Sequence, residues 1–405
     1  MSNTIQTLAK WQEKFPNGFK SIAVDVSGFC NAKCKYCPAG RDLSHKGEFI
    51  ALDLYENLLH KLQEYKMYFS NETAFQIYCL GEPLLHPEIN EILKITHKCG
   101  MHTNISTNAS VVPTIDAEGL KAVDRVLISM PGFSQSSYDK IHGFNFEHIK
   151  NNILKLKKCF SNIPFDMTYH IYQFNMNEIE AARCFCEEND IRFAPNYAVL
   201  MDKNKCMGYV SNTMPYEELK DISKELFLGV LDEQIKVSPR NYCDFQQSYL
   251  SVNANGEVRI CSSFPKAYEE KVLCGNLLED NIDVLLEKKY SYSRCQQCIA
   301  AGLTLGQGYD CKVFPDYYFS VMKENEYLRD CVSNLSVEQK NVNEDLVFMH
   351  QVRAWENDHY SEIELEKLLE LLHQNKVGLE DMKKIILQYG RFGSKTVNMF
   401  VKLIG

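Results

Sequence analysis

Apolar and polar positions alternate with two different periods over the first half of the chain. The period of an amphipathic helix appears in three stretches, the first with Leu54, Leu58, Leu59 and Leu62 on one face. The helical stretches cover residues 52–65, 90–100 and 146–159. Short apolar stretches with strand composition cover residues 21–27, 73–80, 101–107, 124–130, 165–172 and 191–199. This alternation predicts parallel strand pairing, and therefore an α/β fold with a doubly wound sheet or a barrel.

The stretch at residues 165–172 separates its side chains by polarity. Asp166, Thr168, His170 and Tyr172 share one parity, and successive side chains of a strand point to opposite faces. The intervening positions are Met167, Tyr169 and Ile171. An open sheet covered by helices on both faces should be apolar on both. One polar parity therefore favours a barrel whose interior is wet and holds ligands.

The second half of the chain is organised differently. One helix is expected within residues 216–235, and Asn255 followed by Gly256 predicts a tight hairpin turn. Ser361 and Glu364 have capping-box spacing ahead of an apolar stripe, which predicts amphipathic helices. The predicted division is an N-terminal extension (1–18), a barrel (19–200), a bridge (201–240), a cysteine-rich domain (241–312) and a helical C-terminal extension (313–405).

Composition narrows the class of protein. The 405 residues carry a formal charge of −9, which argues against a nucleic-acid surface and suits a small-molecule or peptide substrate. The chain shows no segment typical of a signal peptide or a membrane span, so we expect a cytoplasmic protein that does not bind membranes. In that reducing compartment, 16 cysteines indicate metal binding or catalysis more than disulfides.

Three cysteines lie close together after the first predicted strand. Cys30, Cys34 and Cys37 are one thiolate short of a closed tetrahedral zinc site. A cubane iron–sulfur cluster has four irons that each need a terminal ligand, so three cysteines leave one iron open. Buried inert cysteines, or a zinc site completed by a distant residue, are the alternatives.

The spacing C-x3-C-x2-C, with Tyr36 before the last cysteine, resembles the signature of the radical S-adenosylmethionine (SAM) enzymes. The resemblance implies a partial (β/α)6 barrel with a [4Fe–4S] cluster held by the three cysteines at its open end. It also implies that the amino and carboxylate groups of SAM chelate the open iron. One electron, from a reductant such as flavodoxin or ferredoxin, cleaves SAM to a 5′-deoxyadenosyl radical that abstracts a hydrogen atom from the substrate.

Later motifs resemble those of the same family. "CLGEPLLHPEI" follows the second predicted strand and is similar to the family's Gly-Gly-Glu-Pro motif, with Leu80 in place of the first glycine. "NISTNA" and "LISMPG" end the third and fourth strands, with Ala109 and Pro131 where the family commonly has glycine and aspartate. The residues that the resemblance implies for SAM binding are Tyr36, Gly81, Glu82, Pro83, Ser106, Asn108 and Ser129.

Four cysteines of the second half form another pattern. Cys243, Gly256 and Cys261, followed by the C-x2-C pair Cys295 and Cys298, resemble the auxiliary-cluster domain of many radical SAM enzymes. The pattern is similar to the shortened (Twitch) form more than to the full (SPASM) form, which implies one auxiliary [4Fe–4S] cluster on these four cysteines. A zinc ribbon is the alternative. A role as further ligands stays open for Cys274, Cys311 and Cys331.

The resemblance implies a radical SAM oxidoreductase or epimerase. A closed auxiliary cluster suits electron transfer and thus oxidation (dehydrogenation), whereas epimerisation needs a hydrogen donor. We expect a carbohydrate-like small-molecule substrate, with His170 and Arg192 gripping it or taking its proton and Cys206 as the thiol donor. The alternative is modification of a ribosomal peptide or protein, by thioether or carbon–carbon crosslinking, epimerisation or sulfatase-type maturation. We expect no N-terminal peptide-recognition domain, because the predicted barrel starts near Phe19, and this disfavours the peptide alternative. The sequence carries no signal for an oligomeric state.

Overall fold

The computed structural model describes most of the first 304 residues. The described residues are 18–37, 48–211, 213–226, 231, 235, 238, 240–263 and 272–304. The expected C-terminal helices lie outside the described residues, as do residues 1–17 of the N-terminal extension, Cys311 and Cys331.

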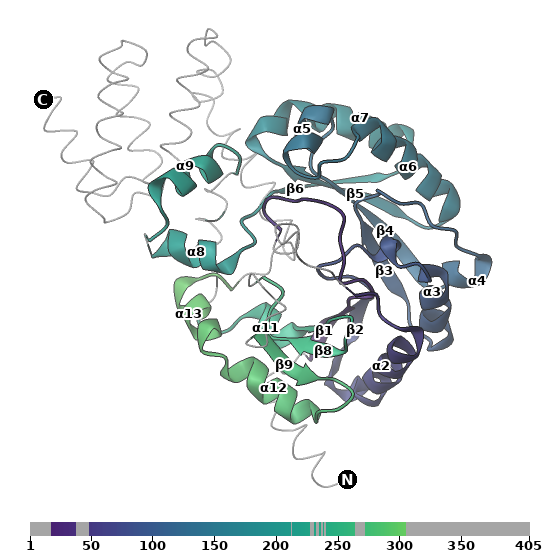
Figure 1. Cartoon of the computed structure of the whole chain (residues 1–405), viewed down its shortest axis with the longest axis vertical. Coiled ribbons are helices and arrows are strands. Elements are labelled where there is room, and N and C mark those ends of the chain that lie inside the picture. Colours follow the sequence, from purple (N-terminus) through teal and green to yellow (C-terminus); the bar gives the residue numbers. More distant parts are fainter. Residues whose placement is uncertain are drawn as a thin grey trace, which may run out of the picture.

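All six strands predicted in the first half are present and pair in parallel. Their order in the sheet is β6-β5-β4-β3-β2-β1. The strands are β1 (Phe19–Val24), β2 (Phe69–Gln76), β3 (Thr103–Thr107), β4 (Val123–Met130), β5 (Phe165–Ile171) and β6 (Arg192–Tyr197). In Figure 1 they form an open arc with helices along its outside, which is the partial barrel expected from the sequence.

Helices connect the strands and cover the outer side of the arc (Figure 1). Those of the barrel are α2 (Leu52–Glu64), η1 (Lys66–Tyr68), η2 (Pro83–Leu85), α3 (Ile89–Lys98), α4 (Ala117–Leu120), α5 (Gln135–Lys140), α6 (Phe146–Cys159), η3 (Gln173–Glu178) and α7 (Ile179–Glu188). The bridge contributes α8 (Lys203–Val210) and α9 (Tyr216–Ser223), and the cysteine-rich domain contributes α11 (Asp244–Ser248), α12 (Ile282–Ser291) and α13 (Ser293–Ala301).

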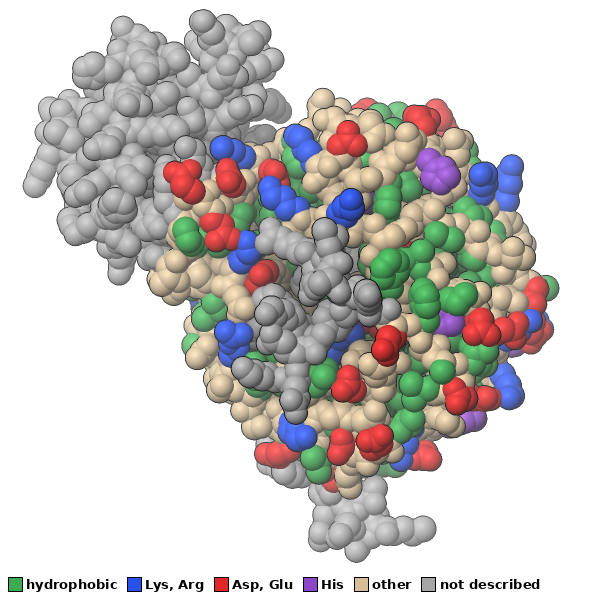
Figure 2. All heavy atoms as spheres, viewed as in Figure 1, with side chains coloured by type: hydrophobic (Ala, Val, Ile, Leu, Met, Phe, Trp, Pro, Cys, Tyr) green, Lys and Arg blue, Asp and Glu red, His purple; other side chains and the backbone are tan. Residues whose placement is uncertain are grey.

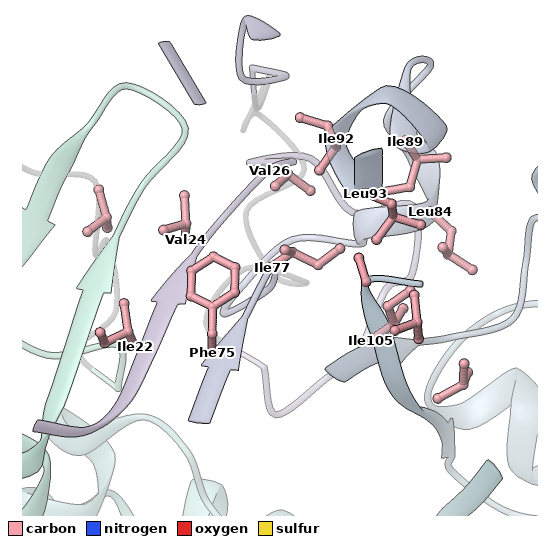
Figure 3. Packing of buried hydrophobic residues seen from close by; sticks show 14 of the residues in the cluster. Ile22, Val24, Val26, Phe75, Ile77, Leu84, Ile89, Ile92, Leu93 and Ile105 are labelled. Carbon is pink, nitrogen blue, oxygen red and sulfur yellow. The ribbon is translucent and has the colours of Figure 1, made fainter. Parts of the chain in front are cut away.

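Apolar side chains of strands and helices meet in one core. Figure 3 shows part of it: Ile22, Val24, Val26, Phe75, Ile77 and Ile105 from the strand side, with Leu84, Ile89, Ile92 and Leu93 from η2 and α3. On α2 the fully buried residues are Tyr55, Leu58, Leu59 and Leu62, whereas Leu54 is only partly buried. The buried face of this helix is therefore rotated slightly from the stripe that the leucines predict.

The two faces of β5 differ as its alternating sequence predicts. Met167 and Tyr169 belong to the core under the helices, so Asp166, Thr168 and His170 face the inside of the arc. Thr168 and His170 are half-buried. Asp166 is fully buried, and its carboxylate is neutralised by Arg125 and Arg192, the former at 2.7 Å. The interior of the partial barrel is thus polar.

The cysteine-rich domain continues the same sheet. Strand β7 (Tyr249–Val252) pairs in parallel with β1, and β8 (Glu257–Arg259) and β9 (Leu273–Asn276) follow in antiparallel order. Gly256 adopts a φ of +80° in the predicted hairpin turn, a conformation that favours glycine. The described strands therefore form one nine-stranded sheet, a continuity that the sequence pattern does not predict.

The surface mixes charges of both signs. On the face shown in Figure 2, Lys and Arg side chains are interspersed with Asp and Glu side chains. The protein also has exposed ion pairs, for example Lys98 with Glu56 at 2.7 Å. Such surface pairs contribute about 0–1 kcal/mol each. No helix within the described residues has the length and apolar character needed to cross a membrane.

Candidate active site

The loop after β1 carries the first three cysteines. Cys30, Cys34 and Cys37 are partly exposed, and the N–H of Cys37 donates to the carbonyl of Cys34 at 3.2 Å. Burial raises the pKa of Cys30 to about 12, and it raises the pKa of Cys34 well above its ordinary value. The Cys37 thiolate raises both pKa values further. This mutual repulsion indicates that the three sulfur atoms lie in one small region.

Neighbouring segments hold this loop in place. The N–H of Gly28 donates to the carbonyl of Glu48 at 2.8 Å, and the N–H of Lys33 donates to the carbonyl of His142 at 3.2 Å. The Asn31 amide donates to the Ser110 hydroxyl at 3.0 Å. The loop is therefore attached to the segments that follow β3 and β4 as well as to its own continuation.

The bridge also contacts the cysteine motif. The Tyr36 hydroxyl donates to Glu225 Oε2 at 2.5 Å, and Lys35 Nζ pairs with Glu225 Oε1 at 2.8 Å. The Tyr36 ring stacks on Tyr172, with 6.1 Å between the ring centroids. Nothing in the sequence pattern pointed to Glu225, because a single acidic residue after a helix is ordinary. The structure makes it the residue that holds the motif's aromatic ring from outside the barrel.

Gly81 lies where the cysteine loop approaches the loop after β2. A Cβ atom on Gly81 would stand 1.6 Å from the carbonyl oxygen of Ser27 and 3.2 Å from that of Phe29. The next N–H, that of Glu82, donates to the Phe29 carbonyl at 2.9 Å. Gly81 is therefore required by the close approach of two backbones.

The Glu82 carboxylate is buried at the centre of these loops. It accepts hydrogen bonds from the N–H of Asn108 at 2.7 Å and from the N–H of Leu84 at 3.1 Å. Glu82 directly precedes Pro83, the first residue of η2. Burial raises the pKa of Glu82 to about 7. Among the described residues no Lys, Arg or His pairs with it. A buried carboxylate of this kind fits a ligand that brings a positive charge.

Asn108 connects the ends of β1 and β3. Its amide donates to Asn31 Oδ1 at 3.1 Å and approaches Cys30 Sγ at 3.9 Å. The next residue, Ala109, has a φ of +59°, in the region that favours glycine. The position where the family commonly has glycine therefore keeps a glycine-like backbone. Ser106 is half-buried on the polar side of β3.

The predicted substrate residues lie at different places. His170, at the end of β5, is 3.2 Å from the Ser129 hydroxyl, and burial lowers its pKa to about 4, so the imidazole is neutral at pH 7. Arg192 lies at the start of β6, at the opposite end of the strands, and pairs with Asp166. Cys206 is 1% exposed, and its thiol donates to the Leu200 carbonyl at 3.0 Å. Only His170 lies beside a residue implied to bind SAM.

The donor chemistry of the first cysteine loop fits a [4Fe–4S] cluster. Thiolates are the ligands of such clusters, and metal binding replaces the proton that burial otherwise keeps on Cys30 and Cys34. Within the described residues, no three His, Cys, Asp or Glu side chains surround a single metal-ion position. A cubane makes a different demand, because each thiolate binds its own iron atom.

The four cysteines of the second half come from three separate segments. Cys243 precedes α11, Cys261 follows β8, and Cys295 and Cys298 lie one turn apart on α13. Burial raises the pKa of Cys295 to about 12 and that of Cys298 to about 11, and the Cys261 thiolate adds to both shifts. Cys274 lies on β9 and is fully buried in the core. Four thiols from these segments fit a fully ligated iron–sulfur cluster, in which each thiolate binds its own iron atom. The alternative zinc ion would need all four around one position, and within the described residues no three such side chains surround a single metal-ion position.

A buried ion pair joins the barrel to the cysteine-rich domain. Asp25, directly after β1, pairs with Arg259 of β8 at 2.7 Å, and both side chains are 0% exposed. Asp25 Oδ1 also accepts hydrogen bonds from the N–H groups of Cys79 and Leu80, in the loop that leads to Gly81. The sequence reasoning missed this pair, because the two residues are far apart and lie in no recognised motif.

Replacing Glu82 by glutamine is expected to change how stability depends on pH. A carboxyl with a raised pKa stabilises the fold below its unfolded pKa of about 4.5, and this contribution is lost as the pH rises through about 7. The SAM-free wild type should therefore lose up to about 3 kcal/mol relative to Glu82→Gln between pH 5 and pH 8. Urea unfolding of both proteins at the two pH values checks this. A difference that does not vary with pH would contradict it.

The chain is similar to known proteins over part of its length. Residues 24–185 match the family model described as "Radical SAM superfamily". The AdoMet-dependent heme synthase of Methanosarcina barkeri is 24% identical over 167 residues, which are 40% of this chain and 46% of the synthase. The match thus spans less than half the length of that relative.

Two solved structures align with the chain at low identity. SuiB of Streptococcus suis bound to its precursor peptide SuiA aligns with a TM-score of 0.49 at 14% identity, over 75% of this chain and 74% of SuiB. BtrN in complex with AdoMet and 2-DOIA aligns with a TM-score of 0.40 at 15% identity, over 70% of this chain and 88% of BtrN.

Proposed function

We propose, on the premise that residues 24–185 form a radical SAM domain, that this protein is a radical SAM enzyme. The observation that carries the proposal is the meeting of three thiols and one buried carboxylate at the same loops. Cys30, Cys34 and Cys37 would hold a [4Fe–4S] cluster, and Glu82 would face the amino group of SAM. When bound, the cluster and SAM supply a 5′-deoxyadenosyl radical that abstracts a hydrogen atom from the substrate.

The chain's own residues hold and orient these groups. Gly81 lets the Glu82 backbone reach the cysteine loop, and the Glu82 carboxylate in turn holds the N–H of Asn108. Tyr36 is fixed by Glu225 and by stacking on Tyr172. The Ser129 hydroxyl and the neutral His170 offer hydrogen bonds to SAM or the substrate at the ends of β4 and β5.

The substrate class is argued from the inner face of the strands. Asn104, Ser106, Thr168 and Asn196 point there and are half-buried, uncharged and able to donate or accept hydrogen bonds. The charged residues of β4 to β6 on this face pair with one another through Asp166. Uncharged hydrogen-bonding groups suit a neutral, hydroxylated molecule. We therefore propose a carbohydrate-like small molecule as the substrate.

The proposed outcome is oxidation, with Cys243, Cys261, Cys295 and Cys298 holding an auxiliary [4Fe–4S] cluster. A Twitch-like domain of this kind would accept the electron that a substrate radical gives up together with a proton. Cys206 as a hydrogen donor would instead allow epimerisation. Its burial in α8 and its bond to the Leu200 carbonyl favour the first outcome.

The activity is tested with anaerobically reconstituted protein. Incubation with SAM and dithionite is expected to yield 5′-deoxyadenosine, and a variant with Cys30, Cys34 and Cys37 replaced by alanine serves as the control. Wild-type protein with a full complement of iron that forms no 5′-deoxyadenosine would contradict the proposed function.

The two outcomes leave different traces in the product. Oxidation consumes no net reductant beyond the first turnover and incorporates no solvent hydrogen. Epimerisation in deuterated water places one deuterium at the inverted carbon. Mass spectrometry of products from a panel of polyhydroxylated compounds, with and without deuterated water, distinguishes them.

A further inference from the structure

Two lysine side chains are buried beside the cysteines of the second half. Lys203, the first residue of α8, is 6% exposed, and Lys289, on α12, is 1% exposed. Lysine is almost never buried to this degree unless its charge is balanced. Neither ammonium pairs with an Asp or Glu within the part of the chain that the structure describes. Cysteine thiols of the second half lie within range of both charges.

Both lysines border the segments that carry the cysteines. Lys289 Nζ donates to the carbonyl of Ile260 at 2.8 Å, and Ile260 directly precedes Cys261. The N–H of Lys203 donates to the carbonyl of Ser263 at 3.0 Å, two residues after the same cysteine. Helix α8 packs against α13, which carries the C-x2-C pair (Figure 1). The two lysines thus border the cysteine site from two different helices.

The lysine charges lower the pKa values of cysteine thiols in the second half of the chain. Burial raises the pKa of Cys295, and the Lys289 ammonium offsets part of that rise. The Lys203 ammonium does the same for Cys298 and Cys243. Charges in a water-excluded interior are weakly screened, so these interactions persist at physiological ionic strength.

We infer that Lys203 and Lys289 are the buried counter-charges of the auxiliary cluster and raise its reduction potential. The inference rests on the proposed function, which places a [4Fe–4S] cluster on the four cysteines. A cluster bound by four thiolates is anionic and gains one more negative charge when it accepts an electron. A fixed positive charge stabilises the reduced state more than the oxidised state. The electron accepted is the one that the substrate radical loses, with a proton, on becoming the oxidised product. The lysines therefore favour dehydrogenation.

The test is a redox titration followed by electron paramagnetic resonance. Full-length protein with Cys30, Cys34 and Cys37 replaced by alanine carries only the auxiliary cluster, so its signal is unambiguous. Lys203→Met and Lys289→Met keep an unbranched side chain of similar length and remove the charge. Each is expected to lower the equilibrium constant for reduction roughly tenfold or more, which corresponds to about 59 mV for a one-electron couple. The double variant should show a larger shift than either single variant.

Matched variants separate charge from structure. Lys288→Met removes the same charge from the same helix at an exposed position, where water screens it, and should shift the potential little. Lys203→Arg and Lys289→Arg keep the charge and should keep both the iron content and the potential. If Lys203→Met and Lys289→Met fail to bind iron, the arginine variants show whether loss of the charge is the cause. Loss of iron in Lys203→Arg and Lys289→Arg as well would overturn the inference.

Failure of the inference is distinguishable from failure of the proposed function. An intact cluster whose potential is unchanged in Lys203→Met and Lys289→Met overturns the inference and leaves the auxiliary cluster in place. Zinc instead of iron at the four cysteines, found by metal analysis of the triple-alanine protein, overturns the inference and the proposed oxidative outcome. The proposed cleavage of SAM fails only if iron-loaded wild-type protein forms no 5′-deoxyadenosine.

Discussion

Replacing Gly81 by alanine is expected to abolish 5′-deoxyadenosine formation. The added Cβ would stand 1.6 Å from the Ser27 carbonyl oxygen, a backbone atom that cannot move without displacing the cysteine loop. The hydrogen bond from the Glu82 N–H to the Phe29 carbonyl, now 2.9 Å, would be lost with it. Chromatographic assay of 5′-deoxyadenosine, with iron content and visible absorption of the cluster measured in parallel, checks the result.

Gly208→Ala is the matched control for this substitution. Gly208 lies in α8, where an added Cβ would meet its nearest neighbour, the Met214 nitrogen, at an ordinary 3.7 Å. Alanine in a helix interior should stabilise the protein by about 1 kcal/mol and leave the activity unchanged. A Gly81→Ala protein that cleaves SAM at the wild-type rate would contradict the steric role assigned to this glycine.

Replacing Arg259 by methionine is expected to lower the free energy of unfolding by about 3–5 kcal/mol. The reason is that Asp25 is 0% exposed and would lose its ion-pair partner, now at 2.7 Å, while staying buried. Asp25 also accepts the N–H groups of Cys79 and Leu80, so the loop that carries Gly81 should be disturbed as well. Urea unfolding measures the first effect, and the yield of 5′-deoxyadenosine measures the second.

A double-mutant cycle isolates the contribution of this pair. Asp25→Asn combined with Arg259→Met removes both charges and should cost less than the sum of the two single changes. Lys98→Met breaks the exposed pair with Glu56, also 2.7 Å long, and should cost less than about 1 kcal/mol. If Arg259→Met costs no more than Lys98→Met, the buried pair does not join the two parts of the sheet as described.

The elements of the barrel follow from local pattern. The alternation of strand and helix periods predicts all six barrel strands and the helices α2, α3 and α6, because burial of one face imposes a period on the sequence. The polar parity of residues 165–172 likewise predicts the polar inner face that Thr168 and His170 form. The resemblance to the radical SAM motifs implies that Cys30, Glu82 and Asn108 serve one site, and in the structure Asn108 contacts both of the others.

The sequence by itself thus determined the local elements, the spacing of the cysteines and the motifs that follow the strands. Only the tertiary structure decided that β7 pairs with β1, that Asp25 meets Arg259, and that Glu225 reaches Tyr36. It also decided that Lys203 and Lys289 are buried. The physical reason is that an ionic residue in a sequence normally signals a solvated surface. Whether such a residue is instead buried depends on segments far away along the chain, which leave no period in the sequence around it.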